Sequence, residues 1–100
     1  MFARVNIFEG APEGIDAAVE IAGARVVPAL EGVDGFAGML ILADRTSGKS
    51  LGITLWHTED ALKASEKLAS GMRSDVATES GERVVGVERY EVMLDERRGS

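Results

Sequence analysis

The stretch FAGMLILADRTSGKSLGITLW, residues 36–56, decides the fold. Its first part is a near-continuous apolar run that is too short for a solvent-facing helix, and its last part resumes the character of a strand. The polar connection at residues 44–49 contains Gly48, which can adopt the positive φ that tight turns require. The stretch therefore predicts two antiparallel strands, Phe36–Ala43 and Leu51–Trp56, that pair as a hairpin.

A strand and a helix are predicted before this hairpin. Residues Phe2–Glu9 alternate with the period of a strand, placing Arg4 and Asn6 on one side of it. From Ile15 the apolar positions change to helical spacing, which indicates an amphipathic helix. Because Pro28 obstructs its continuation, we expect this helix to weaken or kink near Val27.

A second helix and a last strand are predicted after the hairpin. Thr58 is a good N-cap, and apolar residues at helical spacing follow it. Gly71 and Arg73 are typical of a helix end, so we expect a polar linker over residues 74–82. The final strand is predicted at Val84–Leu94.

The predicted order of elements is strand, helix, strand, strand, helix, strand. This order folds as a four-stranded antiparallel sheet with two helices on one face, the ferredoxin-like βαββαβ arrangement of the α+β class. The chain of 100 residues is short enough for one core. We therefore expect a single domain over residues 1–94 and a flexible tail at residues 95–100.

Apolar residues on both sides of the predicted sheet indicate a second layer. Phe2, Phe8, Trp56 and the apolar second strand exceed what two short helices are expected to hide. A second copy of the sheet would cover the remainder, giving a homodimeric α+β barrel. Such a barrel would enclose an apolar space between sheet and helices that suits a small apolar or aromatic ligand.

The composition argues against several functions. Eleven basic and 17 acidic residues give a net charge of -6, which repels nucleic acid. There is no cysteine and His57 is the only histidine, so we expect no metal site. No stretch approaches the roughly 20 apolar residues that a membrane helix needs, so we expect no membrane insertion and a cytoplasmic location.

Several short motifs resemble those of one known family. They are Asn6, Gly35–Gly38, Asp44-Arg45, Leu55–Ala61 and Val87–Val92. With the order of elements, they are similar to the antibiotic biosynthesis monooxygenase-like branch of the dimeric α+β barrel superfamily, over about the first 94 residues. That group includes cofactor-independent oxygenases of phenolic polyketides, haem-degrading oxygenases and members with no assigned reaction. The resemblance thus implies a fold and leaves the activity open.

The haem-degrading members provide a specific test. They use an asparagine on the first strand, a tryptophan on the third strand and an axial histidine on the second helix. Asn6 and Trp56 match the first two positions. In the second helix, residues 64–67 read ASEK and offer no usual haem ligand. We therefore expect no haem, and no other cofactor.

Three residues are the candidate catalytic group. The Asn6 carboxamide can donate a hydrogen bond to a substrate carbonyl or oxyanion, and Trp56 can stack on a flat ligand or donate through its indole nitrogen. His57 can serve as a general base if it turns inward. The structural alternatives are a satisfied polar group for Asn6, a core or interface anchor for Trp56 and a surface side chain for His57.

Four further residues are candidates for substrate binding. Phe36 and Met39 are expected to line the cavity, while Arg4 and Tyr90 are within possible reach of it. The structural alternative for Arg4 is an exposed residue or a rim salt bridge, and for Tyr90 it is packing on the sheet.

Two functions follow from this reading. The first is a homodimeric, cofactor-independent monooxygenase of a small electron-rich aromatic or polyketide-like substrate, whose anion supplies electrons to dioxygen. The second is a non-catalytic dimeric barrel that binds a small apolar ligand or acts as an association module. Polar groups converging on one point in a pocket favour the first function, and a solidly packed interior favours the second.

Overall fold

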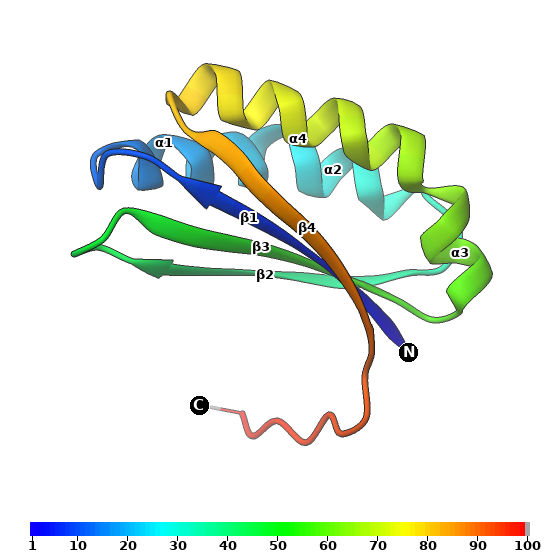
Figure 1. Cartoon of the computed structure of the whole chain (residues 1–100). Coiled ribbons are helices and arrows are strands. Elements are labelled where there is room, and N and C mark those ends of the chain that lie inside the picture. Colours follow the sequence, from blue (N-terminus) through cyan, green and yellow to red (C-terminus); the bar gives the residue numbers. More distant parts are fainter. Residues whose placement is uncertain (100) are drawn as a thin grey trace.

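The structure, a computed structural model, describes residues 1–99 and confirms the predicted βαββαβ order (Figure 1). Ser100 lies outside the described residues. In chain order the elements are β1 (Phe2–Glu9), α1 (Gly14–Ile21), the π-helical segment η1 (Ala22–Val26), α2 (Val27–Glu31), β2 (Phe36–Asp44), β3 (Lys49–Trp56), α3 (Glu59–Ala64), α4 (Glu66–Ser80) and β4 (Arg83–Glu91).

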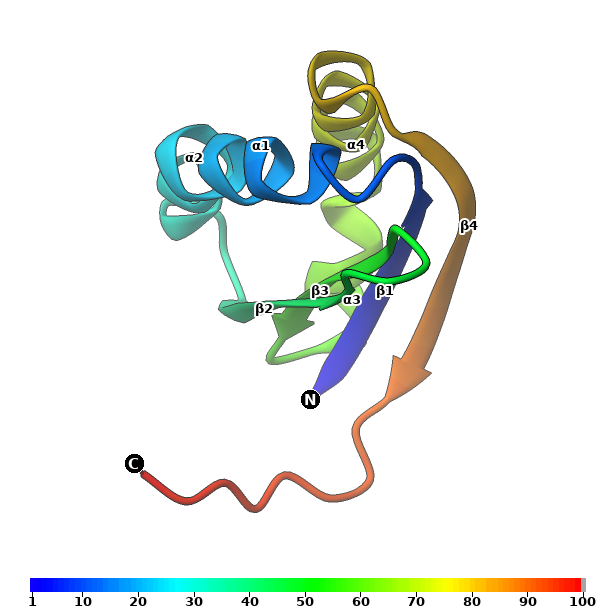
Figure 2. The same ribbon diagram turned by 90° about the vertical axis from the view of Figure 1, so that its left-hand side faces the viewer.

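The four strands form one antiparallel sheet in the order β2-β3-β1-β4. Strand β1 lies in the interior of the sheet, with Asn6 opposite Gly52 of β3 and Val87 of β4. Within the described residues 1–99, the helices all lie on one face of this sheet and leave the other face without a helix (Figure 2). This is the predicted ferredoxin-like arrangement.

Alternation along the strands gives the two faces different chemistry. Phe2, Arg4, Asn6 and Phe8 of β1 point toward the helices, as the contacts of Arg4 with Leu62 and of Asn6 with Arg73 establish. The opposite face carries two apolar rows across three strands. We call these six residues the open-face patch: Val5, Ile53, Leu40, Ile7, Leu51 and Leu42.

The first helical region, residues 14–31, changes from α-helical to π-helical winding shortly before Pro28. A π-helical turn, η1, occupies the residues before α2, and Pro28 lies in the first turn of α2. The predicted weakening near Val27 is therefore confirmed. Four residues spaced four apart, Ala18, Ala22, Val26 and Leu30, are all buried in the core. In a regular α-helix each four-residue step overshoots one full turn by about 40°, so the wider π turn helps to keep this series on one face.

The second helical region begins where the sequence predicts but ends later in the chain. The Thr58 hydroxyl accepts a hydrogen bond from the Ala61 backbone N–H, which confirms the predicted N-cap. The helix breaks at the buried Ser65 and then continues as α4 to Ser80, so the predicted end near Arg73 is wrong. A glycine within a helix costs only about 1 kcal/mol. The burial of Val76 and Ala77 beyond Gly71 offsets that cost.

Two other sequence expectations need correction. Phe8 and Trp56 are 7% and 0% exposed beneath the helices, so they do not require a second sheet to cover them. Strand β4 ends at Glu91 rather than Leu94. Residues 92–99 have no regular secondary structure and turn to the helix-free side of the sheet (Figures 1 and 2). Within residues 1–99, none of the helices has the length and apolar content needed to traverse a bilayer.

Candidate functional site

A cavity lies between the helix-covered face of the sheet and the helices, with a volume of about 60 Å³. Most of its wall is apolar, and α4 contributes a stripe at helical spacing that includes Ala69, Met72 and Val76. The polar and charged side chains that line it are Arg4, Asn6, Ser50, Thr54, Arg73 and Glu82. Polar groups among apolar walls are typical of a ligand site.

Arg4 is completely buried, with 0% of its side chain exposed, so the alternative of an exposed residue is wrong. The alternative of a salt bridge is correct, but the ion pair with Glu66 has its arginine buried and not at the rim. Its guanidinium donates to the Leu62 carbonyl at 2.7 Å, to Ser65 Oγ at 3.1 Å and to Glu66 Oε2 at 2.7 Å. The break between α3 and α4 supplies these acceptors. Burial, followed by repulsion from Arg89, lowers the pKa of Arg4. Its Nε has no hydrogen-bond partner among residues 1–99.

Asn6 and Arg73 form a second polar pair in the cavity wall. Asn6 Nδ2 donates to the Gly52 carbonyl at 2.8 Å, and Asn6 Oδ1 accepts from Arg73 Nη1 at 2.9 Å. Burial lowers the pKa of Arg73, and repulsion from Arg4 lowers it further. Among residues 1–99, Arg73 forms no ion pair with a carboxylate. The remaining N–H groups of Arg73, the second Nδ2 hydrogen of Asn6 and the Arg4 Nε that is unpartnered within residues 1–99 are donors left for a ligand.

Trp56 forms one wall of the cavity and is fully buried. Its indole nitrogen donates to Thr54 Oγ1 at 3.0 Å, so that donor is already used within the chain. The Phe36 ring packs edge-on against it with centroids 5.6 Å apart, and the Arg4 guanidinium lies 5.9 Å from the ring centroid. These contacts hold the indole as a rigid apolar surface.

The remaining predicted site residues fall in different places. Met39 lines the cavity, while Phe36 supports Trp56 from outside the lining. His57 is exposed and lies outside the cavity. It directly follows Trp56 at the end of β3, and side chains of successive residues in an extended chain point to opposite sides. Tyr90 is 53% exposed in a groove near Phe2, and its hydroxyl donates to Glu88. The structure thus groups Arg4, Asn6, Met39 and Trp56 and leaves His57 and Tyr90 apart.

Sequence reasoning missed two charged residues of the cavity. Arg73 was interpreted as a helix end and Glu82 as part of a polar linker. Glu82 is only 7% exposed and accepts hydrogen bonds from Ser80 Oγ at 3.0 Å and Ser50 Oγ at 3.3 Å. The buried stripe of α4 could have placed Arg73, whereas no local signal marks Glu82 as buried. Within residues 1–99, no group of three His, Asp or Glu side chains is arranged to hold a metal ion.

Solved structures with the same fold include two oxygenases and a haem-degrading protein. The ActVA-Orf6 monooxygenase of Streptomyces coelicolor, in complex with nanaomycin D, has a TM-score of 0.71 and 17% identity, covering 99% of this chain and 92% of that one. SnoaB, a cofactor-independent oxygenase from Streptomyces nogalater, has a TM-score of 0.63 and 20% identity over 94% of both chains. MhuD, a haem-degrader from Mycobacterium tuberculosis with two haems bound, has a TM-score of 0.60 and 25% identity over 97% of this chain and 100% of that one. The chain therefore has the fold of the antibiotic biosynthesis monooxygenase-like branch, as the sequence motifs imply.

Sequence comparison gives longer relatives. The uncharacterised protein Rv2557 of Mycobacterium tuberculosis is 32% identical over 92 residues, which is 92% of this chain and 41% of that protein. The chain thus spans about two fifths of the length of this curated relative. No protein-family model matches the chain.

Proposed function

We propose that this chain is a cofactor-independent monooxygenase that oxidises a small electron-rich aromatic or polyketide-like substrate in the cavity between sheet and helices. The observation that carries the proposal is the Asn6–Arg73 pair, which presents hydrogen-bond donors to an otherwise largely apolar space. A substrate oxygen that gains negative charge would be stabilised there, because half-buried donors in a largely apolar space act more strongly than donors in water.

The reaction needs only the substrate and dioxygen. A substrate CH₂ group that is conjugated with a carbonyl through an aromatic ring, as in an anthrone, loses a proton, and the resulting enolate passes one electron to O₂. The two radicals join through a C–O bond to give a hydroperoxide. Loss of water from the hydroperoxide leaves a ketone, so four electrons leave the substrate carbon and reduce O₂ to one ketone oxygen and one water.

Each lining residue has a role in this scheme. Arg73 and the Asn6 carboxamide hold the enolate oxygen, and Trp56 provides a flat surface for the ring system. A volume of about 60 Å³ is smaller than the roughly 150 Å³ that accommodates benzene in an engineered apolar cavity, so a ring must displace side chains. Met39 and Met72 line the cavity, and methionine adapts its shape easily.

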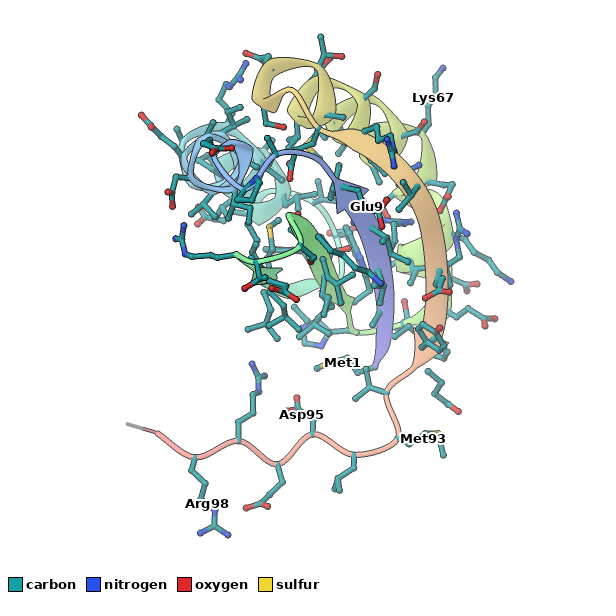
Figure 3. All side chains as sticks on the ribbon, turned by 60° about the vertical axis from the view of Figure 1, so that its left-hand side comes forward. Met1, Glu9, Lys67, Met93, Asp95 and Arg98 are labelled. Atoms are coloured by element: carbon teal, nitrogen blue, oxygen red, sulfur yellow. The ribbon has the colours of Figure 1, made fainter. Side chains whose placement is uncertain are left out.

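The proposed enzyme is a homodimer. Leu40 and Leu42 of the open-face patch are 41% and 49% exposed, which is a large apolar exposure for a sheet face. Met93 and Leu94 of the tail are each 84% exposed, and Met93 projects from the tail in Figure 3. A second copy stacked on the patch would bury it, and the tail would then brace the partner.

A non-catalytic barrel is the second candidate function. The apolar majority of the cavity wall favours it, since a small apolar ligand needs no proton transfer. Haem is a weaker candidate ligand. Helix α4 has no histidine, and His57 lies outside the cavity.

Oxygen uptake with a panel of phenolic and anthrone-type substrates tests the proposal. Wild type should consume oxygen with at least one of them, and Asn6→Ala should be about 100-fold slower, the usual effect of losing one oxyanion donor. Asp95→Asn in the tail is the control and should match wild type. Binding of the panel without oxygen uptake by any protein would favour the non-catalytic barrel.

A further inference from the structure

The proposed reaction needs a group that takes a proton from the substrate. The titratable side chains that line the cavity are Arg4, Arg73 and Glu82. Arginine stays protonated in proteins and cannot accept a proton. His57, the base expected from the sequence, lies outside the lining. Glu82 is therefore the titratable lining residue that can serve as a proton acceptor.

The surroundings of Glu82 leave its charge uncompensated. Its two carboxylate oxygens accept from the hydroxyls of Ser80 and Ser50, and it forms no ion pair among residues 1–99. A carboxylate has about four lone-pair sites, so two hydroxyl donors leave room to receive a proton. A buried carboxylate that lacks a cationic partner is unusual, because its charge is costly to remove from water.

Two glycines allow the chain to close over Glu82. A Cβ built on Gly10 would lie 3.1 Å from Glu82 Cγ, and one built on Gly14 would lie 3.4 Å from the same atom and 2.8 Å from the Ser80 carbonyl oxygen. Larger residues at these positions would push the loop off the glutamate. The loop between β1 and α1 thus keeps water from Glu82 while the carboxylate remains part of the cavity wall.

Glu82 and Asn6 contact β3 at different points along that strand. Its partner Ser50 is opposite Phe8, whereas Asn6 is opposite Gly52, two residues further along β3. Two residues of an extended strand span about 6.8 Å. That span is comparable to the long dimension of two fused aromatic rings, so one substrate can reach both points.

We propose that Glu82 is the general base of this site and takes the proton from the substrate CH₂ group while Arg73 and Asn6 hold the enolate oxygen. This inference rests on the proposed oxygenase function and adds its proton acceptor. The peroxide anion formed with O₂ takes the proton back from Glu82. The restored carboxylate removes the second CH proton as the O–O bond breaks, and the departing hydroxide takes that proton to become water.

Proton removal can be measured separately from oxidation. The probe is 1,8-dihydroxy-9-anthrone in D₂O without oxygen, and the readout is exchange of its CH₂ protons for deuterium, followed by NMR. Wild type should accelerate exchange above the buffer rate. Glu82→Gln should lose about 100-fold or more of this acceleration, the usual contribution of a positioned base. Glu79→Gln on the exposed side of α4 is the matched control and should exchange like wild type.

A second variant separates chemistry from folding. Glu82→Asp keeps a carboxylate but retracts it by one methylene. It should therefore retain a faster exchange than Glu82→Gln, while the thermal unfolding temperatures of the two variants should be equal. Exchange that is as fast in Glu82→Gln as in wild type would overturn the proposal, and so would a wild type that fails to accelerate exchange. If wild type accelerates exchange but consumes no oxygen in air, the role of Glu82 as a general base would stand and the proposed oxygenase function would be rejected.

Discussion

The guanidinium of Arg73 on α4 donates to the Asn6 carboxamide on β1 at 2.9 Å, which joins two residues 67 positions apart at the wall of one cavity. Asn6 is also fixed by its bond to the Gly52 carbonyl on β3. Because three elements hold the pair, its donors are positioned before any ligand arrives. Preorganised donors of this kind stabilise developing charge without reorganising during the reaction.

The first prediction concerns the charge of Arg73. Arg73→Gln keeps a polar side chain on α4 but removes the positive charge and the guanidinium donor to Asn6, so kcat for oxygen uptake should fall by about 10²- to 10³-fold. Steady-state kinetics with the substrate identified from the panel measure this effect. Arg97→Gln in the tail is the matched control. An unchanged kcat in Arg73→Gln would remove Arg73 from the proposed site.

The second prediction concerns the stability that Arg4 provides. Arg4→Met removes the donor to the buried Ser65 hydroxyl and one of the two donors to the Leu62 carbonyl, which keeps its hydrogen bond from Ser65 Oγ. The free energy of unfolding should therefore drop by about 1–3 kcal/mol. Urea unfolding followed by circular dichroism measures the change. As a control, Arg25→Met breaks only an exposed pair with Glu79 and should cost about 1 kcal/mol or less. Equal losses in the two variants would contradict the structural role assigned to Arg4.

The third prediction concerns the open-face patch. Leu42→Asp places a charge in the proposed dimer interface, so sedimentation equilibrium should give the mass of a monomer where wild type gives a dimer. Leu68→Asp alters a leucine of α4 that is 42% exposed, close to the 49% of Leu42, and should remain dimeric. A well-folded wild-type monomer at micromolar concentration would refute the dimer.

The fourth prediction concerns acid stability. Asp44 Oδ1 accepts from the backbone N–H groups of Thr46 and Ser47 in the β2–β3 turn, and these bonds lower the pKa of Asp44. A lowered folded pKa adds stability above the unfolded value of about 3.9, and that stability is lost as the pH falls through the folded pKa. Asp44→Asn should therefore be less stable than wild type at pH 6. The gap should narrow as the pH falls below about 4, the unfolded pKa, as urea unfolding at each pH would measure. A gap independent of pH would contradict this account.

The sequence was sufficient for the fold because its periodicity is local. Three signals define the element order, and each depends only on residues close to it in the sequence. They are the alternation in residues 2–9, the turn at Gly48 and the N-cap at Thr58. The hairpin could be predicted for the same reason. The end of the second helix was misplaced, because the packing of Val76 against the core outweighs the helix-breaking tendency of Gly71. The end of the last strand was also misplaced, by three residues.

The candidate site could be predicted only in part. Asn6 and Trp56 follow from strand alternation, which places both on the helix-covered face. Arg4 shares that face, but its burial depends on the Ser65 break, which supplies acceptors from 58 or more residues away. Glu82 could not be found at all, since its burial depends on two distant glycines, Gly10 in the β1–α1 loop and Gly14 at the start of α1.

The π-helical turn at Ala22–Val26 holds about one residue more than an α-helical turn. Deleting one residue from this turn would let the segment rewind as an ordinary α-helix. Because the shortened segment would still complete about one turn, Leu30 would stay on its side of the helix. Relatives that keep the same chamber are therefore expected to tolerate the loss of one residue here. A deletion within the regular helix α4 would instead rotate every later residue of that helix by about 100° around its axis.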